Sequence, residues 1–221
     1  MQFGENLVIS QPKLNNLNKD IMKALIITLF CGLMTVNTLF AKEFERPTSV
    51  DYQKGVEALN EGDIEQAYTC LTNELNAHPK NGYAHCYMAL VCNFCGDAKL
   101  AFHAVNESLC FIPKADTEYR AFAYYTRGML LMNAQAYDEA EKDLNEAIRL
   151  TPSDVENYKA RAEVYMNMGK YEESLADLQT AMKLDSHADV YDLMMQLLEA
   201  NPDPVFFDQV TSAFSNATAS R

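Results

Sequence analysis

The sequence predicts an all-α fold in which four helix hairpins stack into a solenoid and a C-terminal helix pair follows them. Residues of the same kind recur in four consecutive segments, at offsets of 34, 39 and 34 positions. Within each segment the apolar residues follow the three-and-four spacing of a buried helical face. One hairpin cannot bury its own apolar face, so the hairpins must stack on one another.

Four kinds of position keep this register. A small residue lies in the first helix of each hairpin, at Gly55, Ala89, Gly128 and Ala162. A second small residue follows twelve places later, at Ala67, Ala101, Ala140 and Ser174. A branched apolar residue comes next, at Leu71, Val105, Leu144 and Leu178. The segments close at Pro79, Pro113, Pro152 and Ser186. Small residues at these places let paired helices approach closely.

The ends of the helices are also marked in the sequence. Gly62, Gly96 and Gly169 stand where a first helix must stop. Proline ends a second helix because it lacks an amide donor and restricts the residue before it. The middle offset contains five extra residues, which we assign to residues 116–120.

These positions resemble the tetratricopeptide repeat, a helix–turn–helix unit with a period of about 34 residues. The resemblance covers residues 48–188 as four repeats, 48–81, 82–115, 121–154 and 155–188. Repeats three and four match best, whereas repeat one departs at Glu74, where the family has a small residue. The resemblance implies a right-handed α-solenoid that binds a protein or peptide partner, with no enzymatic activity and no cofactor.

In tetratricopeptide proteins the first helices line a concave surface that holds extended peptides or partner helices. Carried over by position, the resemblance implies a groove lined by Tyr52, Val56, Asn60, Leu90, Asn93, Phe94, Tyr125, Met129, Met132, Asn133, Lys159, Met166 and Asn167. Asparagine can pair with a peptide backbone, and methionine and aromatic side chains give adaptable apolar contact. Two alternatives remain open: this stripe is filled by the chain's own termini, or it is ordinary packing between helices.

The N-terminal region has the pattern of an export signal. Residues 24–41 carry no charge, Lys23 precedes them, and a polar stretch follows. We predict a signal peptide over residues 22–41, cleaved after Ala41, with an uncleaved membrane anchor as the alternative. Residues 1–21 are interpreted as a start-site artefact or a disordered lead, and residues 42–47 as a linker. The predicted location is a bacterial periplasm or cell envelope.

Beyond the fourth repeat, residues 189–214 predict two more helices around a break at residues 201–204. They read as a cap or a degenerate fifth repeat, and residues 215–221 read as a frayed tail. The net charge of −13 disfavours nucleic acid as a partner, because phosphates would be repelled.

The cysteines offer a second function. Cys92 and Cys95 have the spacing of a dithiol motif, which leaves a disulfide or thiol-redox chemistry as an alternative. The pair falls at the end of a helix, where the helix dipole disfavours a thiolate. No metal site is predicted, because the cysteine and histidine spacings lack paired clusters. A structural subunit of an envelope assembly is a further alternative.

Overall fold

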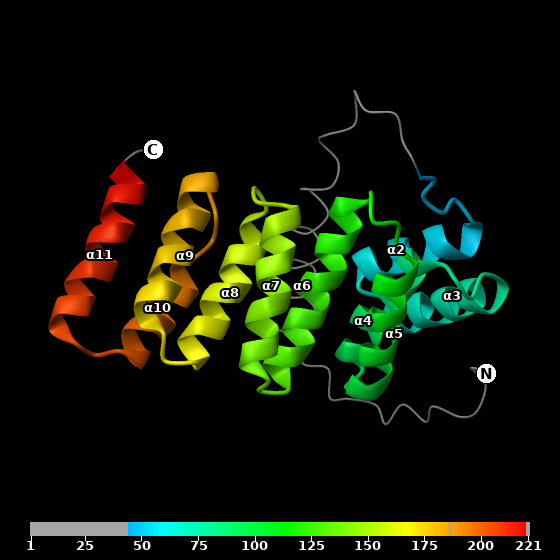
Figure 1. Cartoon of the computed structure of the whole chain (residues 1–221), viewed down its shortest axis with the longest axis horizontal. Coiled ribbons are helices and arrows are strands. Elements are labelled where there is room, and N and C mark those ends of the chain that lie inside the picture. Colours follow the sequence, from blue (N-terminus) through cyan, green and yellow to red (C-terminus); the bar gives the residue numbers. More distant parts are fainter. Residues whose placement is uncertain (1–43, 186, 220–221) are drawn as a thin grey trace. The chain divides into compact units, whose positions relative to one another are not determined.

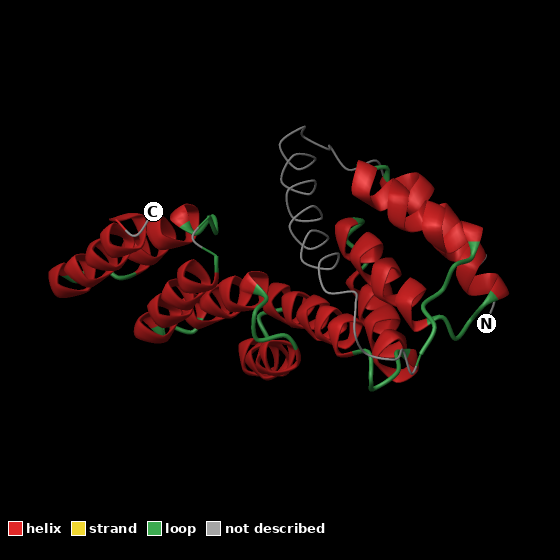
Figure 2. Ribbon diagram, turned by 90° about the horizontal axis from the view of Figure 1, so that it is seen from above, coloured by secondary structure: helices red, strands yellow, loops and turns green. Residues whose placement is uncertain are grey.

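The computed structural model describes residues 44–185 and 187–219, and every regular element in these ranges is an α-helix (Figure 2). The helices in chain order are α2 (Val50–Glu61), α3 (Ile64–Ala77), α4 (Gly82–Phe94), α5 (Ala98–Phe111), α6 (Thr117–Asn133), α7 (Tyr137–Leu150), α8 (Val155–Asn167), α9 (Tyr171–Leu184), α10 (Tyr191–Ala200) and α11 (Pro204–Ala219). The predicted signal and the residues before it lie outside the described part of the chain.

The helices pack as consecutive pairs. Helix α2 packs on α3 and α4 packs on α5 in an N-terminal unit that ends at Thr126. Helix α8 packs on α9 (Figure 1) in a C-terminal unit that begins at Arg127, so α6 begins in one unit and ends in the other. The fold class is the predicted all-α solenoid of helix hairpins.

The small residues in the first helices have the packing role that the repeat pattern predicted. A Cβ added at Gly55 would lie 2.8 Å from Cγ of Leu71, and one at Gly128 would lie 2.9 Å from Cγ of Leu144. In the fourth hairpin the hydroxyl of Ser174 is buried and donates to the carbonyl of Ala162 at 2.8 Å. The second helix therefore packs directly against the backbone of the first.

The hairpin turns need a residue in the left-handed conformation. Gly62, Gly96 and Gly169 adopt φ values of 77°, 79° and 74°. In the third hairpin Gln135 takes this place with a φ of 60°, although a left-handed backbone is unfavourable for residues with a Cβ. The sequence signal of a turn glycine is therefore missing from the third hairpin, while the turn itself is kept.

The third and fourth hairpins each contain an ion pair that the repeat pattern does not indicate. Arg127 makes two hydrogen bonds to Asp143, at 2.6 and 2.8 Å, and Arg161 makes two to Asp177, both at 2.7 Å. Each pair joins the first helix of a hairpin to the second and spans sixteen positions of the chain. Such two-point pairing fixes the position of one helix along the other.

Three boundaries differ from those expected. Helix α6 begins at Thr117, four residues before the predicted repeat, because most of the five extra residues extend this helix. Helix α10 begins at Tyr191, and α11 continues to Ala219, through most of the stretch read as a tail. Asn201 to Asp203 separate the last two helices, where the sequence indicated a break.

The last two helices cover the apolar side of α9. Met194 and Leu197 of α10 and Phe206 and Val210 of α11 join Leu178 in one buried cluster. Their outer surface is not polar throughout, since Val205 and Phe207 are 67% and 50% exposed.

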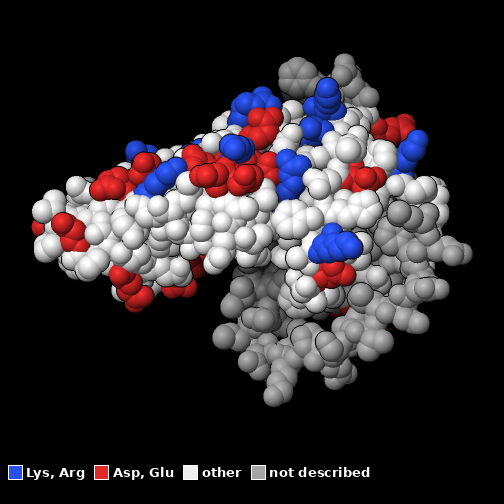
Figure 3. Space-filling model, turned by 60° about the horizontal axis from the view of Figure 1, so that its bottom comes forward, with Lys and Arg blue, Asp and Glu red and all other residues white. Residues whose placement is uncertain are grey.

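Charged side chains of both signs lie on the surface. Figure 3 shows acidic groups beside basic ones on one face of the molecule. None of the helices in the described ranges is long and apolar enough to cross a bilayer.

Candidate functional site

An aromatic cluster joins the first helices in the N-terminal unit. Tyr52 of α2, Tyr83 and Tyr87 of α4, and Tyr119 and Phe122 of α6 are all buried. Rings of Tyr83 and Tyr119 meet edge to face with centroids 4.8 Å apart, and those of Tyr87 and Phe122 are 5.6 Å apart. Edge-to-face pairs of this kind add to the stabilisation that burial of the rings provides. The cluster therefore fixes three helices of this unit against one another.

Arg46, from the extended residues before α2, lies on this cluster. Its guanidinium donates through Nε and Nη2 to the two carboxylate oxygens of Asp116, both at 3.0 Å. Nη2 also donates to Glu118, and the guanidinium carbon lies 4.6 Å from the ring centroid of Tyr119. A fork of two parallel hydrogen bonds and an aromatic face are the two contacts for which a guanidinium is best shaped.

The charge on Arg46 and the proton on Tyr83 are both stabilised at this site. Burial alone would lower the pKa of Arg46, but its hydrogen bonds to Asp116 and Glu118 outweigh burial and raise it above the ordinary value. Burial and the charge of Asp116 raise the pKa of Tyr83, so this phenol keeps its proton. The Tyr83 hydroxyl donates that proton to Oδ2 of Asp116 at 3.0 Å. Both side-chain donors to Asp116 therefore keep their protons at neutral pH.

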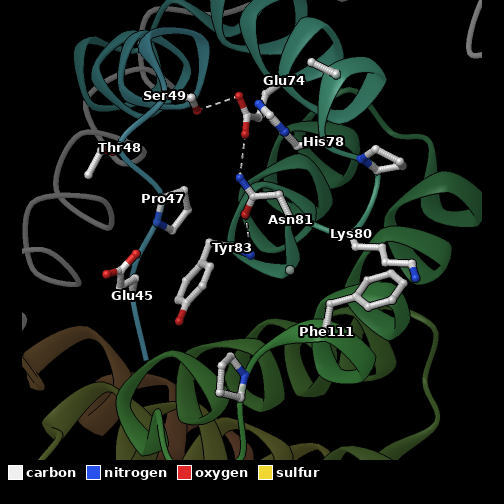
Figure 4. A pocket seen from close by; sticks show the side chains of 14 residues that line it. Glu45, Pro47, Thr48, Ser49, Glu74, His78, Lys80, Asn81, Tyr83 and Phe111 are labelled. Carbon is white, nitrogen blue, oxygen red and sulfur yellow. Dashed lines mark hydrogen bonds between the residues drawn. The ribbon is translucent and has the colours of Figure 1, made fainter. Parts of the chain in front are cut away.

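A cavity of about 830 Å³ lies beside the same extended residues. Figure 4 shows Glu45, Pro47, Thr48 and Ser49 on one side of it, and the α3–α4 turn on the other. The remaining lining residues are Glu74, Ala77, His78, Pro79, Lys80, Asn81, Gly82, Tyr83, Phe111 and Pro113. The wall is thus formed by the end of α3, the start of α4 and the end of α5.

Glu74 holds one wall of this cavity together. It is 2% exposed and stands where the repeat pattern has a small residue. One carboxylate oxygen accepts from Ser49 Oγ at 2.6 Å and the other from Asn81 Nδ2 at 2.7 Å (Figure 4). Asn81 also caps α4, because its side-chain oxygen accepts from the amides of Tyr83 and Ala84. The departure at Glu74 therefore connects the extended residues to the first helix of the second repeat.

Next to the cavity, burial favours the neutral form of His85. Its Nε2 lies 2.9 Å from the carbonyl of Pro79, and its ring stacks on Phe111. Burial lowers the pKa of His85, against the opposing effect of the Pro79 carbonyl and Glu107. Protons therefore bind more tightly to this histidine in the unfolded chain than in the folded one.

His85 should make stability depend on pH. The stabilisation from the neutral ring is present above the unfolded pKa of about 6.5 and is lost as the pH falls through and below it. We expect a lower free energy of unfolding at about pH 5.5 than at about pH 7.5, and a smaller difference for His85→Gln. Urea unfolding at both pH values measures this. An unchanged pH difference in His85→Gln would show that other groups cause it.

The predicted groove residues of the N-terminal unit divide by exposure. Tyr52 and Tyr125 are buried, at 8% and 5% exposure, so a partner cannot reach them in this conformation. The others are half-buried: Val56, Asn60, Leu90, Asn93 and Phe94. They lie in the later turns of α2 and α4.

In the C-terminal unit Met132 is 8% exposed and belongs to the core. Met129, Lys159 and Met166 are half-buried, whereas Asn133 and Asn167 are exposed. Asn167 donates to the carbonyl of Glu163 within its own helix, and Lys159 pairs with Glu156 at 3.1 Å. Most positions of the predicted groove thus carry a side chain with some accessible surface.

The dithiol pair is poorly suited to thiol chemistry. Cys92 and Cys95 are both free thiols. Burial raises the pKa of Cys92 to about 12, and burial and Asp97 raise that of Cys95. A reactive cysteine needs the opposite shift, because the thiolate is the nucleophile. No group of residues suited to a metal ion occurs in the described part of the chain.

Sequence reasoning missed Arg46, Asp116 and Glu118. The repeat pattern shows residues 116–120 only as an insertion, and it leaves Arg46 in the linker before the first repeat. Arg46 and Asp116 are 70 positions apart, so no local spacing could connect them.

Comparison with known proteins identifies tetratricopeptide repeats in the chain. Tetratricopeptide-repeat models match residues 121–154 and 155–187. The chain is 29% identical to the 58 kDa phosphoprotein of Plasmodium berghei over 79 residues, which cover 36% of the chain but 19% of that protein. It is also 29% identical over 133 residues to the photosystem I assembly protein Ycf3 of Prochlorococcus marinus, covering 53% of the chain and 77% of Ycf3.

A solved structure shows the same fold. The crystal structure of MamA has a TM-score of 0.60 at 18% identity, and the match covers 78% of this chain and 95% of MamA. Three observations indicate the same repeat architecture. Family models match two repeats, most of the length of Ycf3 aligns with the chain, and paired helices meet at close glycine contacts. Residues 121–187 are therefore two tetratricopeptide repeats in an all-α solenoid of helix hairpins, an architecture typical of scaffolds for protein–protein interaction.

Proposed function

We propose that the chain is an exported scaffold that holds an extended peptide or a partner helix along the first helices of its hairpins. Families of this repeat are generally non-enzymatic, and the proposal assigns the chain no catalytic activity and no cofactor. The uncharged run at residues 24–41 supports export to a periplasm or cell envelope. Ycf3 is by its name an assembly protein, which supports a role in bringing other proteins together.

The observation that carries the proposal is the set of partly accessible side chains on the first helices. In the N-terminal unit Leu90, Asn93 and Phe94 end α4 in half-buried positions. Asn93 can donate to and accept from a peptide backbone, and Leu90 and Phe94 offer apolar area beside it. This combination binds a peptide through its backbone and a few anchors, so affinity does not need a long matching sequence.

A site-specific photo-crosslinker at Asn93 tests the groove. In native cells we expect it to capture a protein partner, and the crosslinked species should be found in the exported fraction. The matched control is the same crosslinker at Asn73, an exposed asparagine on the second helix α3. Repeat proteins bind through one face, so Asn73 should give at most a weak product.

Two results would contradict this proposal. Equal crosslinking from Asn93 and Asn73 would show that contact does not favour the first helices. Crosslinking from Asn73 alone would place the partner on the opposite side of the hairpins, as a structural subunit of an assembly would require.

A further inference from the structure

Arg46 occupies a site shaped for a guanidinium group. The two carboxylate oxygens of Asp116 receive two parallel donors, and the ring of Tyr119 lies under the guanidinium. Glu118 supplies a second carboxylate, and its side chain is 36% exposed, whereas that of Asp116 is 1% exposed. One acceptor is thus deep and fixed, and the other is at the surface.

The deep acceptor is positioned by groups other than Arg46. Tyr83 donates its hydroxyl proton to Oδ2 of Asp116 at 3.0 Å, and the amide of Tyr119 donates to Oδ1 at 3.3 Å. Tyr83 itself is packed edge to face against Tyr119. The carboxylate and the aromatic face are therefore held by contacts from α4 and α6 that do not involve the residues before α2.

The residues around Arg46 contact the repeats through their own side chains. Residues 44–49, the N-terminal segment, contain no helix, and Pro47 restricts Arg46 to an extended backbone. Arg46 anchors the middle of this segment on Asp116, and Ser49 anchors its end on Glu74. An extended stretch thus contacts the helical repeats through one anchoring arginine and one serine, as a bound peptide would.

We propose that Asp116, Glu118, Tyr83 and Tyr119 form a binding site for an arginine of a partner's extended peptide, and that the N-terminal segment fills it as a tethered competitor. The site takes arginine followed by proline, the sequence of the segment itself. Lysine fits less well, because an ammonium cannot form the paired contacts with one carboxylate. The inference rests on the proposed function, since it specifies one anchor of the peptide that the scaffold holds.

When a tethered competitor occupies a site, the apparent affinity of a free ligand equals its intrinsic affinity multiplied by the fraction of time that the site is open. The full chain with Arg46→Ala should therefore bind a fluorescent peptide of sequence FERPTS, copied from residues 44–49, at least about ten-fold more tightly than the wild type does. Fluorescence anisotropy measures both affinities. Replacing the arginine of the peptide with citrulline, which is neutral and nearly the same shape, should abolish binding.

The controls separate the site from a general effect on folding. Circular dichroism shows whether Arg46→Ala is folded. Adding Asp116→Asn to Arg46→Ala should remove peptide binding, because asparagine keeps an acceptor for the Tyr119 amide but loses the charge and one paired acceptor. If Arg46→Ala does not fold, hydrogen exchange of the wild type serves instead. Excess FERPTS peptide should then speed exchange of the amides in residues 44–49, and the citrulline peptide should not.

Three outcomes would overturn the inference: equal peptide affinity in the wild type and Arg46→Ala, equal binding of the citrulline peptide, or an Arg46-dependent dimer in which a second copy supplies the arginine. Each is distinguishable from failure of the scaffold. If crosslinking at Asn93 still captures a partner, the groove stands and only the arginine site is wrong. If that crosslinking fails while the peptide binds, the arginine site stands without the wider groove.

Discussion

Replacing Arg161 with methionine is expected to lower the free energy of unfolding of the C-terminal unit by about 2–3 kcal/mol. The change leaves the Asp177 carboxylate, whose side chain is 8% exposed, without the two hydrogen bonds that Arg161 supplies. A buried charge without its partner is costly even where the intact pair adds little net stability. Urea unfolding followed by circular dichroism measures the loss.

The chain itself suggests the control. In the second repeat the positions equivalent to Arg161 and Asp177 carry Met88 and Ala104, and both are buried. The double variant Arg161→Met with Asp177→Ala should therefore recover more than half of the lost stability. A second control, Arg149→Met, removes an exposed pair with Glu146 and should change the free energy of unfolding by less than about 0.5 kcal/mol. A double variant as unstable as the single one would contradict this account of the pair.

Gly82→Ala is expected to destabilise the N-terminal unit by about 3 kcal/mol, through overpacking. Gly82 is the first residue of α4, and a Cβ there would lie 2.7 Å from the amide nitrogen of Ile112 and 2.9 Å from the carbonyl carbon of Phe111. Both are backbone atoms at the end of α5, so no side-chain rotation can relieve the contact. The two helices would have to separate at the wall of the cavity.

Gly96→Ala is the matched control. Nothing lies within 4 Å of a Cβ at this position, but its φ of 79° is unfavourable for alanine. The expected loss is therefore about 1–2 kcal/mol, from backbone strain alone. The same urea unfolding experiment compares the two variants. A loss for Gly82→Ala no greater than that for Gly96→Ala would show that α5 yields easily at this point.

The repeat made most of the fold predictable, because the same physical requirement recurs in each hairpin. A small residue opposite a branched one gives close helix contact, as Gly55 and Leu71 show. Turn glycines marked three of the four hairpins, whereas Gln135 shows that a turn can form without its usual residue. The longer α6 was not predicted, since five extra residues between repeats can form a loop or extend a helix with equal ease.

The site was less predictable, because the repeat pattern defines a face of a helix and not its exposure. It assigned Tyr52 and Tyr125 to the groove, but both are covered by neighbouring residues. It identified Glu74 as a departure, but the two donors to its carboxylate, Ser49 and Asn81, lie in different elements. Contacts that depend on residues outside the repeats, such as that of Arg46, carry no periodic signal.

The central claim is that partners bind along the first helices of the hairpins, and the affinity of the partner captured at Asn93 tests it most directly. Leu90 on α4 and Leu109 on α5 are half-buried leucines on the first and second helices of one hairpin. Leu90→Glu should weaken binding at least about ten-fold, as loss of a central apolar contact does, whereas Leu109→Glu should leave it unchanged. Equal affinities of the two folded variants, or a greater loss in Leu109→Glu, would contradict the claim.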